Sequence, residues 1–313
     1  MLIKADALER LVAAIFAAEG CSASESEAIA RHLVSSNLAG HDSHGVIRVP
    51  RYVTTLREGR VIKDQKITIV SENAAMAMID GGFGFGQSIG EQAVAFGLEK
   101  ARKNGCAIVA LRNSAHVGRV GGWAEIAAEA GFVSIHFVNV AGSMLVAPFG
   151  GVDRRMSTAP FCVGVPLPGE PPIILDFATS LVAEGKVLVA SNGGKPLPPG
   201  ALIDPDGALS TDPQTLYGPI EGPGPRNYRR GKGSIRAMGE HRDRALPSCA
   251  RYSPARSPAA AAPVLASAKS RMACCRSIYR PSAFIPTTIS RRKRGATSRF
   301  SRAHGPPVLR ARC

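Results

Sequence analysis

The sequence predicts an α/β protein in which a mixed sheet is flanked by helices. Apolar residues recur at helical spacing in several segments, and short, nearly uncharged runs alternate with those segments and predict strands. The chain has 313 residues and is 45% hydrophobic, which is enough to bury a sizeable core. The alternation of strands and helices is typical of a sheet with helices on its faces.

The N-terminal segment, residues 4–60, is predicted to be helical. Two helices separate near Gly20, each starting with an acidic or hydroxyl residue three positions before a glutamate, the spacing of a capping box. These pairs are Asp6 with Glu9 and Ser24 with Glu27. A third helix is expected from about Ile47 to Glu58, after the polar loop 40–45.

The segment 65–241 is predicted to form the α/β core. Strands are expected at residues 67–70, 74–80, 106–112, 132–140 and 173–180, and helices at 88–104 and from Trp123 to Gly131. A Pro/Gly-rich stretch, 192–226, is expected to be largely loop. Residues 1–241 would therefore form one folded region.

The remaining residues, 242–313, have a different composition. Residues 241–313 hold 16 Lys and Arg against one acid, whereas residues 1–240 hold 23 of each kind, so the tail accounts for the net charge of +15. No sustained amphipathic period runs through it, and a basic segment of low order is expected.

Several classes of protein are excluded by composition. No run of eighteen apolar residues occurs, and acids interrupt the apolar N-terminus, so we expect neither a membrane span nor a signal peptide and place the protein in the cytoplasm. Seven cysteines without regular spacing indicate neither a disulfide framework nor a zinc site, and no cluster has the spacing of metal ligands.

The glycine-rich turn at residues 81–86 lies between a predicted strand and a predicted helix, where a Rossmann phosphate loop would lie. Its GxGxG spacing lacks the third glycine of that fingerprint at the required offset. A tight strand-to-helix turn is the favoured interpretation, and dinucleotide binding is the alternative.

The nine-residue segment from Gly40 to Arg48 holds two imidazoles, a carboxylate, a hydroxyl and a guanidinium. A histidine exchanges protons near neutral pH, and an arginine can hold a carboxylate through two parallel hydrogen bonds. The segment therefore predicts acid–base chemistry on an anion. The alternative is a solvated loop in which Asp42 caps the next helix.

Two further polar residues lie in or directly after predicted strands. His116 follows the strand 106–112, at the sheet edge where α/β proteins place ligands, and Asp176 interrupts an apolar strand. His116 could instead be an isolated structural histidine, and Asp176 could cap its neighbours.

The segments that carry these residues resemble the malate/L-lactate dehydrogenase family of NAD(P)-dependent oxidoreductases, which includes ureidoglycolate, sulfolactate and diketogulonate dehydrogenases. The resemblance covers about residues 3–241. It rests on GHDSHGVIRVPRY, NSAHVGRVGGWAEIAAEAG, APFGG, MSTAPFCVGVP, IILDFATS and GSIRAMGEH.

The resemblance implies a sulfolactate-dehydrogenase-like fold distinct from the Rossmann fold, NAD or NADP as cofactor, and a homodimer. It implies hydride transfer to or from C2 of a small 2-hydroxy or 2-oxo acid, of malate or lactate type. His44 or His116 would carry the proton with Ser43 beside the first, and Arg48 would bind the substrate carboxylate. The residues matching cofactor-contacting segments are Asn139, Val140, Thr158, Ala159, Pro160, Ile174, Leu175 and Asp176.

The resemblance stops near Arg242, where acids and periodicity disappear together. This motivates the hypothesis of a frameshift near codon 242, since Arg, Ala, Pro, Ser and Cys are typical of GC-rich DNA read out of frame. Two alternatives to an active dehydrogenase follow. The chain could be an inactive remnant of such an enzyme, or the basic tail, with SRRKR at 290–294, could bind nucleic acid or another polyanion.

Overall fold

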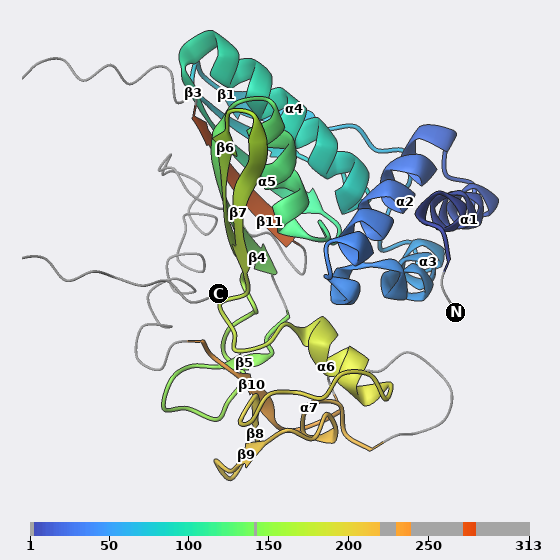
Figure 1. Cartoon of the computed structure of the whole chain (residues 1–313), viewed down its shortest axis with the longest axis vertical. Coiled ribbons are helices and arrows are strands. Elements are labelled where there is room, and N and C mark those ends of the chain that lie inside the picture. Colours follow the sequence, from blue (N-terminus) through green and yellow to red (C-terminus); the bar gives the residue numbers. More distant parts are fainter. Residues whose placement is uncertain (1–2, 141–142, 220–229, 239–271, 280–313) are drawn as a thin grey trace, which may run out of the picture. The chain divides into compact units, whose positions relative to one another are not determined.

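A computed structural model describes residues 3–140, 143–219, 230–238 and 272–279, the last of these as backbone only. Its N-terminal part is helical, as predicted (Figure 1). Helices α1 (Ala5–Ala18) and α2 (Ala23–Leu38) precede two 3-10 turns (Asp42–His44 and Val46–Arg48) and helix α3 (Val49–Arg57). Phe16, Ile29 and Leu33 are fully buried in the cluster that joins these helices.

The start of each N-terminal helix differs from the expectation. Ser22, not Ser24, is the N-cap of α2, and its hydroxyl accepts the backbone N–H of Glu25. Lys4 is the N-cap of α1 and makes no capping bond through its side chain. Overlapping Ser-x-x-Glu spacings made Ser22 and Ser24 equivalent in sequence, whereas only Ser22 has the extended backbone that a cap requires.

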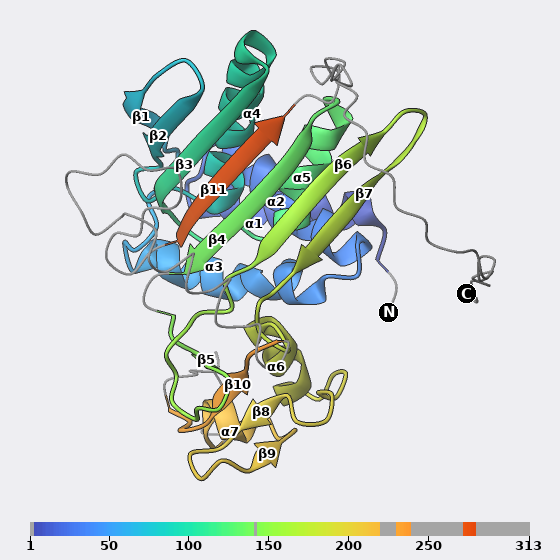
Figure 2. The same cartoon turned by 90° about the vertical axis from the view of Figure 1, so that its left-hand side faces the viewer.

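The principal sheet has seven strands in the order β1-β2-β3-β11-β4-β6-β7 (Figure 2). Its strands are β1 (Thr68–Glu72), β2 (Met76–Asp80), β3 (Cys106–Ser114), β4 (Val133–Val140), β6 (Phe161–Leu167), β7 (Glu170–Phe177) and β11 (Met272–Tyr279). β2 and β3 are connected in sequence by helix α4 (Gly86–Asn104) and pair in parallel. The other neighbouring pairs of strands are antiparallel. The sheet is therefore mixed, as the sequence predicts.

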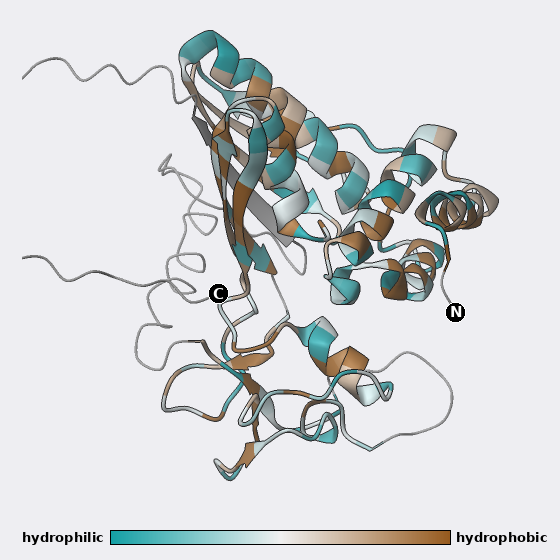
Figure 3. Cartoon of the chain, viewed as in Figure 1, coloured by the Kyte–Doolittle hydropathy of each residue, from teal (hydrophilic) through white to brown (hydrophobic). Residues whose placement is uncertain are grey.

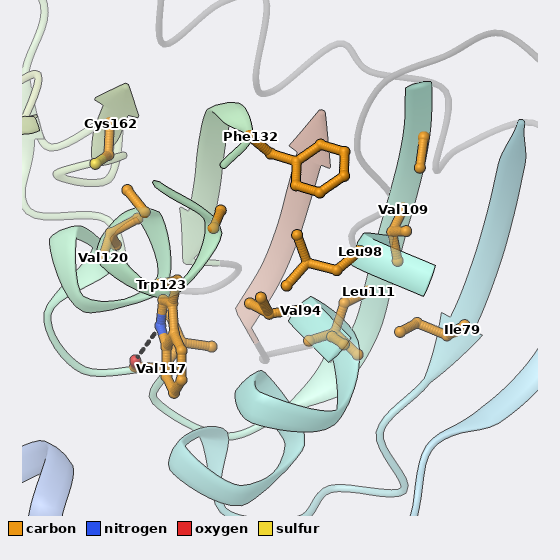
Figure 4. Packing of buried hydrophobic residues seen from close by; sticks show 14 of the residues in the cluster. Ile79, Val94, Leu98, Val109, Leu111, Val117, Val120, Trp123, Phe132 and Cys162 are labelled. Atoms are coloured by element: carbon orange, nitrogen blue, oxygen red, sulfur yellow. Dashed lines mark hydrogen bonds between the residues drawn. The ribbon is translucent and has the colours of Figure 1, made fainter. Parts of the chain in front are cut away.

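Helices α4 and α5 (Val120–Glu129) lie on the same face of this sheet (Figures 1 and 2). Alternate residues of β3 point into the layer between sheet and helices, so Val109 and Leu111 are buried there with Val94 and Trp123 (Figure 4). The Trp123 indole N–H donates to the Val117 carbonyl at 2.9 Å, which ties α5 to the loop before it. The same loop carries His116, so packing of Trp123 in the core helps to fix the position of this histidine.

Strand β11 lies in the segment after Arg242, for which low order is expected. Its eight residues pair antiparallel with β3 on one side and with β4 on the other. Met-Ala-Cys-Cys-Arg-Ser-Ile-Tyr includes a single charged residue, so it can enter a sheet centre although the surrounding tail is strongly basic. The rest of the predicted tail, including SRRKR at 290–294, lies outside the described residues.

A second, four-stranded sheet has the order β5-β10-β8-β9. It comprises β5 (Val146–Ala147), β10 (Ser234–Arg236), β8 (Leu202–Ile203) and β9 (Leu209–Ser210), with helices α6 (Glu184–Ser191) and α7 (Gln214–Tyr217). Leu202, Leu216 and Ile235 are fully buried in its core. The stretch expected to be loop thus contains short elements, which are too brief to produce a periodic signal.

Colouring by hydropathy separates the two sides of the helices (Figure 3). Within the described part of the chain, no helix is both long enough and apolar enough to cross a membrane.

Candidate active site

His44 ends the first of the two 3-10 turns that join α2 to α3, and Arg48 ends the second. Pro50 lies in the first turn of α3, where its missing N–H is tolerated, and α3 therefore begins at Val49. His44 and Arg48 precede that start, so they lie on tight turns and not on a continuous helix. The Ser43 hydroxyl lies 3.0 Å from His44 Nδ1, and Ser43 itself is buried. Asp42 bonds the Asn37 amide at 2.5 Å and does not cap α3, so the alternative interpretation of this loop is wrong.

His116 lies beyond the end of β3 and meets α3 and α4. The hydroxyl of Tyr52, on α3, lies 2.6 Å from His116 Nδ1. Gln87, in the first turn of α4, donates from Nε2 to the Tyr52 hydroxyl and to the His116 backbone carbonyl, each at 3.1 Å. His116 is therefore held by two helices and is not an isolated histidine.

The two predicted histidines come together although 72 positions separate them in the sequence. Their rings are nearly parallel, at 13°, with centroids 5.5 Å apart. Burial, and next the Arg48 charge, lowers the pKa of His44 to about 3 and that of His116 well below its ordinary value. Both rings are therefore neutral at pH 7 and can accept a proton from a substrate.

Arg48 is buried beside this pair, with 6% of its surface exposed. Its Nε donates to the Ser43 carbonyl at 2.6 Å, and both terminal nitrogens lie 3.3 Å from one carboxylate oxygen of Glu184. The Tyr217 hydroxyl donates to the other Glu184 oxygen at 2.6 Å. Burial by itself raises the pKa of Glu184, but Arg48 and the Tyr217 bond outweigh it, and that pKa lies below its ordinary value.

Two glycines allow helices to approach these residues closely. A Cβ on Gly86, at the start of α4, would lie 2.3 Å from the His116 carbonyl oxygen. A Cβ on Gly185, in α6, would lie 2.6 Å from an Arg48 terminal nitrogen. The glycine-rich segment thus forms a tight strand-to-helix turn whose last glycine positions His116.

Gly86→Ala is expected to lower the free energy of unfolding by about 1–3 kcal/mol, because the atoms that the new methyl meets are backbone and must shift. Alanine is otherwise the better helix former by roughly 1 kcal/mol. Urea denaturation measures the difference. A Gly86→Ala protein as stable as the wild type, or more stable, would contradict the close approach.

The residues matching cofactor-contacting segments fall into two groups. Asn139 and Thr158 are half-buried at the end of β4 and the approach to β6, where Pro160 O accepts the Val138 N–H. Ala159 beside them has a left-handed backbone, with φ of 29°, held by Thr179, whose hydroxyl donates to the Ala159 carbonyl. Val140 ends β4 beside Asn139.

The second group lies on β7 and points to both faces of the sheet. Ile174 packs against the core, whereas Leu175 is 51% exposed on the other face. One Asp176 oxygen accepts the Gly121 N–H at 2.7 Å in the first turn of α5, and burial raises the pKa of that carboxyl. Asp176 therefore has a capping role here, one of the two alternatives the sequence leaves open.

Tyr52, Gln87, Glu184 and Tyr217 were not singled out from sequence. Glu184 and Gln87 each carried a weak signal, because each is a polar side chain at the edge of an apolar helical run. Neutral imidazoles beside a buried guanidinium, with hydroxyl groups bonded to them, have the chemical groups that acid–base chemistry on an anionic substrate requires.

Comparison with known proteins shows the family of the chain. The malate/L-lactate dehydrogenase family matches residues 3–247, and the chain belongs to that family. Hydroxycarboxylate dehydrogenase B of Escherichia coli O157:H7 is 44% identical over 242 residues, which are 77% of this chain and 64% of that protein. L-lactate dehydrogenase of Cupriavidus necator is 38% identical over 220 residues, 70% of this chain and 63% of that protein.

The fold of the chain also matches a solved structure. The solved structure of sulfolactate dehydrogenase from Methanocaldococcus jannaschii aligns with a TM-score of 0.74 at 26% identity, covering 91% of this chain and 79% of that one. The predicted sulfolactate-dehydrogenase-like fold, distinct from the Rossmann fold, is confirmed. The match spans just under two thirds of the length of the curated relatives above.

Proposed function

We propose that the protein is an NAD(P)-dependent dehydrogenase that interconverts a small 2-hydroxy acid, of malate or lactate type, and the corresponding 2-oxo acid. The observation that carries the proposal is the meeting of His44, His116 and Arg48. Neutral imidazoles suit a base that takes the proton of a C2 hydroxyl, and a guanidinium suits the neighbouring carboxylate.

Arg48 is proposed to orient the substrate. Its Nε and one N–H of each terminal nitrogen are engaged by Ser43 and Glu184, so each terminal nitrogen keeps one N–H. These two N–H groups point to opposite edges of the planar guanidinium, and one of them is proposed to donate to the substrate carboxylate. A bound carboxylate would also raise the pKa of both histidines, because an opposite charge favours the imidazolium. Substrate binding would thus prepare the histidines to hold the proton that oxidation releases.

The cofactor is proposed to lie against the end of β4. The Asn139 amide and the Thr158 hydroxyl are neutral, half-buried donors and acceptors, which suits the carboxamide of a nicotinamide. Val140, Ala159 and Pro160 would supply backbone contacts, and Ile174 to Asp176 would complete the site from β7. When bound, the nicotinamide supplies or accepts the hydride.

The pH dependence of oxidation follows from the lowered pKa of His44. The base is in its reactive, neutral form above about pH 3, so kcat/KM for the 2-hydroxy acid is expected to be flat between roughly pH 5 and 8. An acid limb centred near pH 6.5, the ordinary histidine value, would contradict the burial of this ring.

A screen of 2-oxo acids for oxidation of NADH and of NADPH tests the proposed function. Consumption of either cofactor that depends on the 2-oxo acid is expected, and Arg48→Met serves as the matched variant. The absence of turnover with every 2-oxo acid would reject the proposal for this chain.

An inactive remnant is the competing proposal, favoured by the observation that the match spans only 64% of the length of the E. coli relative. It predicts poor folding and a melt that does not change with NAD(P)H. Thermal melting with and without cofactor separates the two, since an active protein should melt cooperatively and at higher temperature with cofactor bound.

The frameshift hypothesis concerns the same region. The family match ends at residue 247, close to the change in composition at Arg242. Sequencing the DNA across codons 235–250 tests it: if neither adjacent frame continues the family's sequence, there is no frameshift.

We also propose that the protein forms a homodimer, as membership of the family implies. The edge strand β7 exposes two large apolar side chains, Ile173 and Leu175, and these support a contact between the two copies along this strand. Sedimentation equilibrium is expected to give twice the chain mass of 32.8 kDa. A monomer at micromolar concentration would contradict it.

A further inference from the structure

The side chains of Gln87 and Tyr52 form a hydrogen-bonded chain that ends on His116. The carboxamide of Gln87 lies 3.1 Å from the His116 backbone carbonyl and 3.1 Å from the Tyr52 hydroxyl, through the same atom, Nε2. A backbone carbonyl can only accept, so the atom facing it must be the NH2 group. This contact fixes the orientation of the amide.

The orientation of the Gln87 amide also indicates which atoms donate in the hydrogen bonds of Tyr52 and His116. The Tyr52 oxygen accepts from Gln87, and among the described residues His116 Nδ1, at 2.6 Å, is the one other polar atom within hydrogen-bond distance of the hydroxyl, so the buried hydroxyl has Nδ1 as the acceptor for its own hydrogen. His116 Nδ1 is then an acceptor. In a neutral imidazole whose Nδ1 accepts, Nε2 carries the hydrogen.

The oxygen of the Gln87 amide indicates that this arrangement has an energetic cost. Gln87 Oε1 is buried and has no hydrogen-bond partner among the described residues. A buried unpartnered acceptor is unusual in a native protein. Turning the amide over would set two carbonyl oxygens against each other, so the contact with His116 is kept although it leaves Oε1 without a partner.

His44 has no such constraint. Its Nδ1 faces the Ser43 hydroxyl, which can donate or accept by rotating, so both neutral tautomers of His44 are accommodated.

We propose that Gln87 and Tyr52 are positioning residues that hold His116 as the Nε2–H tautomer, which divides the work of the two histidines. His116 donates a hydrogen bond from Nε2 to the C2 oxygen. His44 accepts the hydroxyl proton in oxidation and returns it in the reverse reaction, and the nicotinamide, when bound, would accept or supply the hydride. The assignment of the C2 oxygen rests on the proposed function, whereas the tautomer does not.

The tautomer can be read without turnover. Long-range ¹H–¹⁵N spectra of the ¹⁵N-labelled full chain at pH 7 distinguish a protonated from an unprotonated ring nitrogen, and His116→Gln assigns the signal. A protonated Nε2 and an unprotonated Nδ1 are expected. A protonated Nδ1 in the wild-type protein would overturn the proposal.

Variants test whether Tyr52 and Gln87 hold His116 as the Nε2–H tautomer. Tyr52→Phe and Gln87→Leu are expected to give mixed His116 tautomers and to lower kcat by roughly tenfold with KM within twofold, the size of one lost hydrogen bond. Gln92→Leu is the matched control, since Gln92 lies on the same helix and bonds Ile67 and Gln65 instead. It should leave both readouts unchanged.

The result that contradicts the positioning role is a Tyr52→Phe protein with lower stability but the wild-type tautomer and kcat. If the wild-type tautomer is as expected and Tyr52→Phe mixes it, but no 2-oxo acid is reduced, the proposed function fails and the positioning of His116 stands.

Discussion

His44→Ala is expected to lower kcat for oxidation of the 2-hydroxy acid by roughly 10²–10⁴-fold, the range for loss of a positioned general base. His116→Ala is expected to lower it by roughly 10²–10³-fold, the range for loss of a donor to a charged oxygen. The neutral state of both rings and their 5.5 Å separation underlie the expectation. Steady-state kinetics at saturating substrate measure both.

His41→Ala is the matched control, because His41 lies in the same loop with its ring centroid 6.4 Å from that of His44. It should retain turnover within about threefold, the scale of a surface change. If His44→Ala and His116→Ala both keep near-native turnover, the acid–base site has been placed wrongly.

Arg48→Met is expected to reduce the free energy of unfolding by about 3–5 kcal/mol, because it leaves the Glu184 carboxylate buried without its partner. It should also raise KM for the 2-oxo acid by roughly 10- to 100-fold, since a charge-assisted hydrogen bond to the substrate carboxylate is lost. Denaturation and steady-state kinetics on one preparation give both values.

The double variant Arg48→Met with Glu184→Gln separates these effects. Glutamine keeps an oxygen for the Tyr217 hydroxyl and removes the unpaired charge, so most of the lost stability should return. KM should stay high, whereas Glu184→Gln by itself should keep it near the wild-type value. A double variant with wild-type KM would show that Arg48 does not hold the substrate.

The sequence predicts those elements of the fold that are long and periodic. Helix α4 begins at Gly86, two residues before its predicted start, and β3 and β4 occupy nearly the expected ranges. Strand β11 could not be predicted, because its pairing with β3 and β4 is set by a gap between two strands that lie far from it in sequence.

The site was predictable where chemistry is concentrated in the sequence and not where it is dispersed. His44, Ser43 and Arg48 lie within one polar loop, so composition indicated them. Glu184 and Gln87 are single polar residues next to helical apolar runs, and only the folded chain brings them to Arg48 and His116. Asp176 was assigned to a cofactor through the resemblance, but locally it caps α5.

Transfer of deuterium tests the central claim most directly. The full chain is incubated with reduced cofactor that carries deuterium at both positions of nicotinamide C4, together with a 2-oxo acid that it turns over, and the product is analysed by mass spectrometry and NMR. The account predicts deuterium at C2 of the 2-hydroxy acid for the wild-type protein, and formation of labelled product reduced by at least roughly 10²-fold in His44→Ala. Cofactor oxidation without label at C2, or equal labelling by the variant, would contradict it.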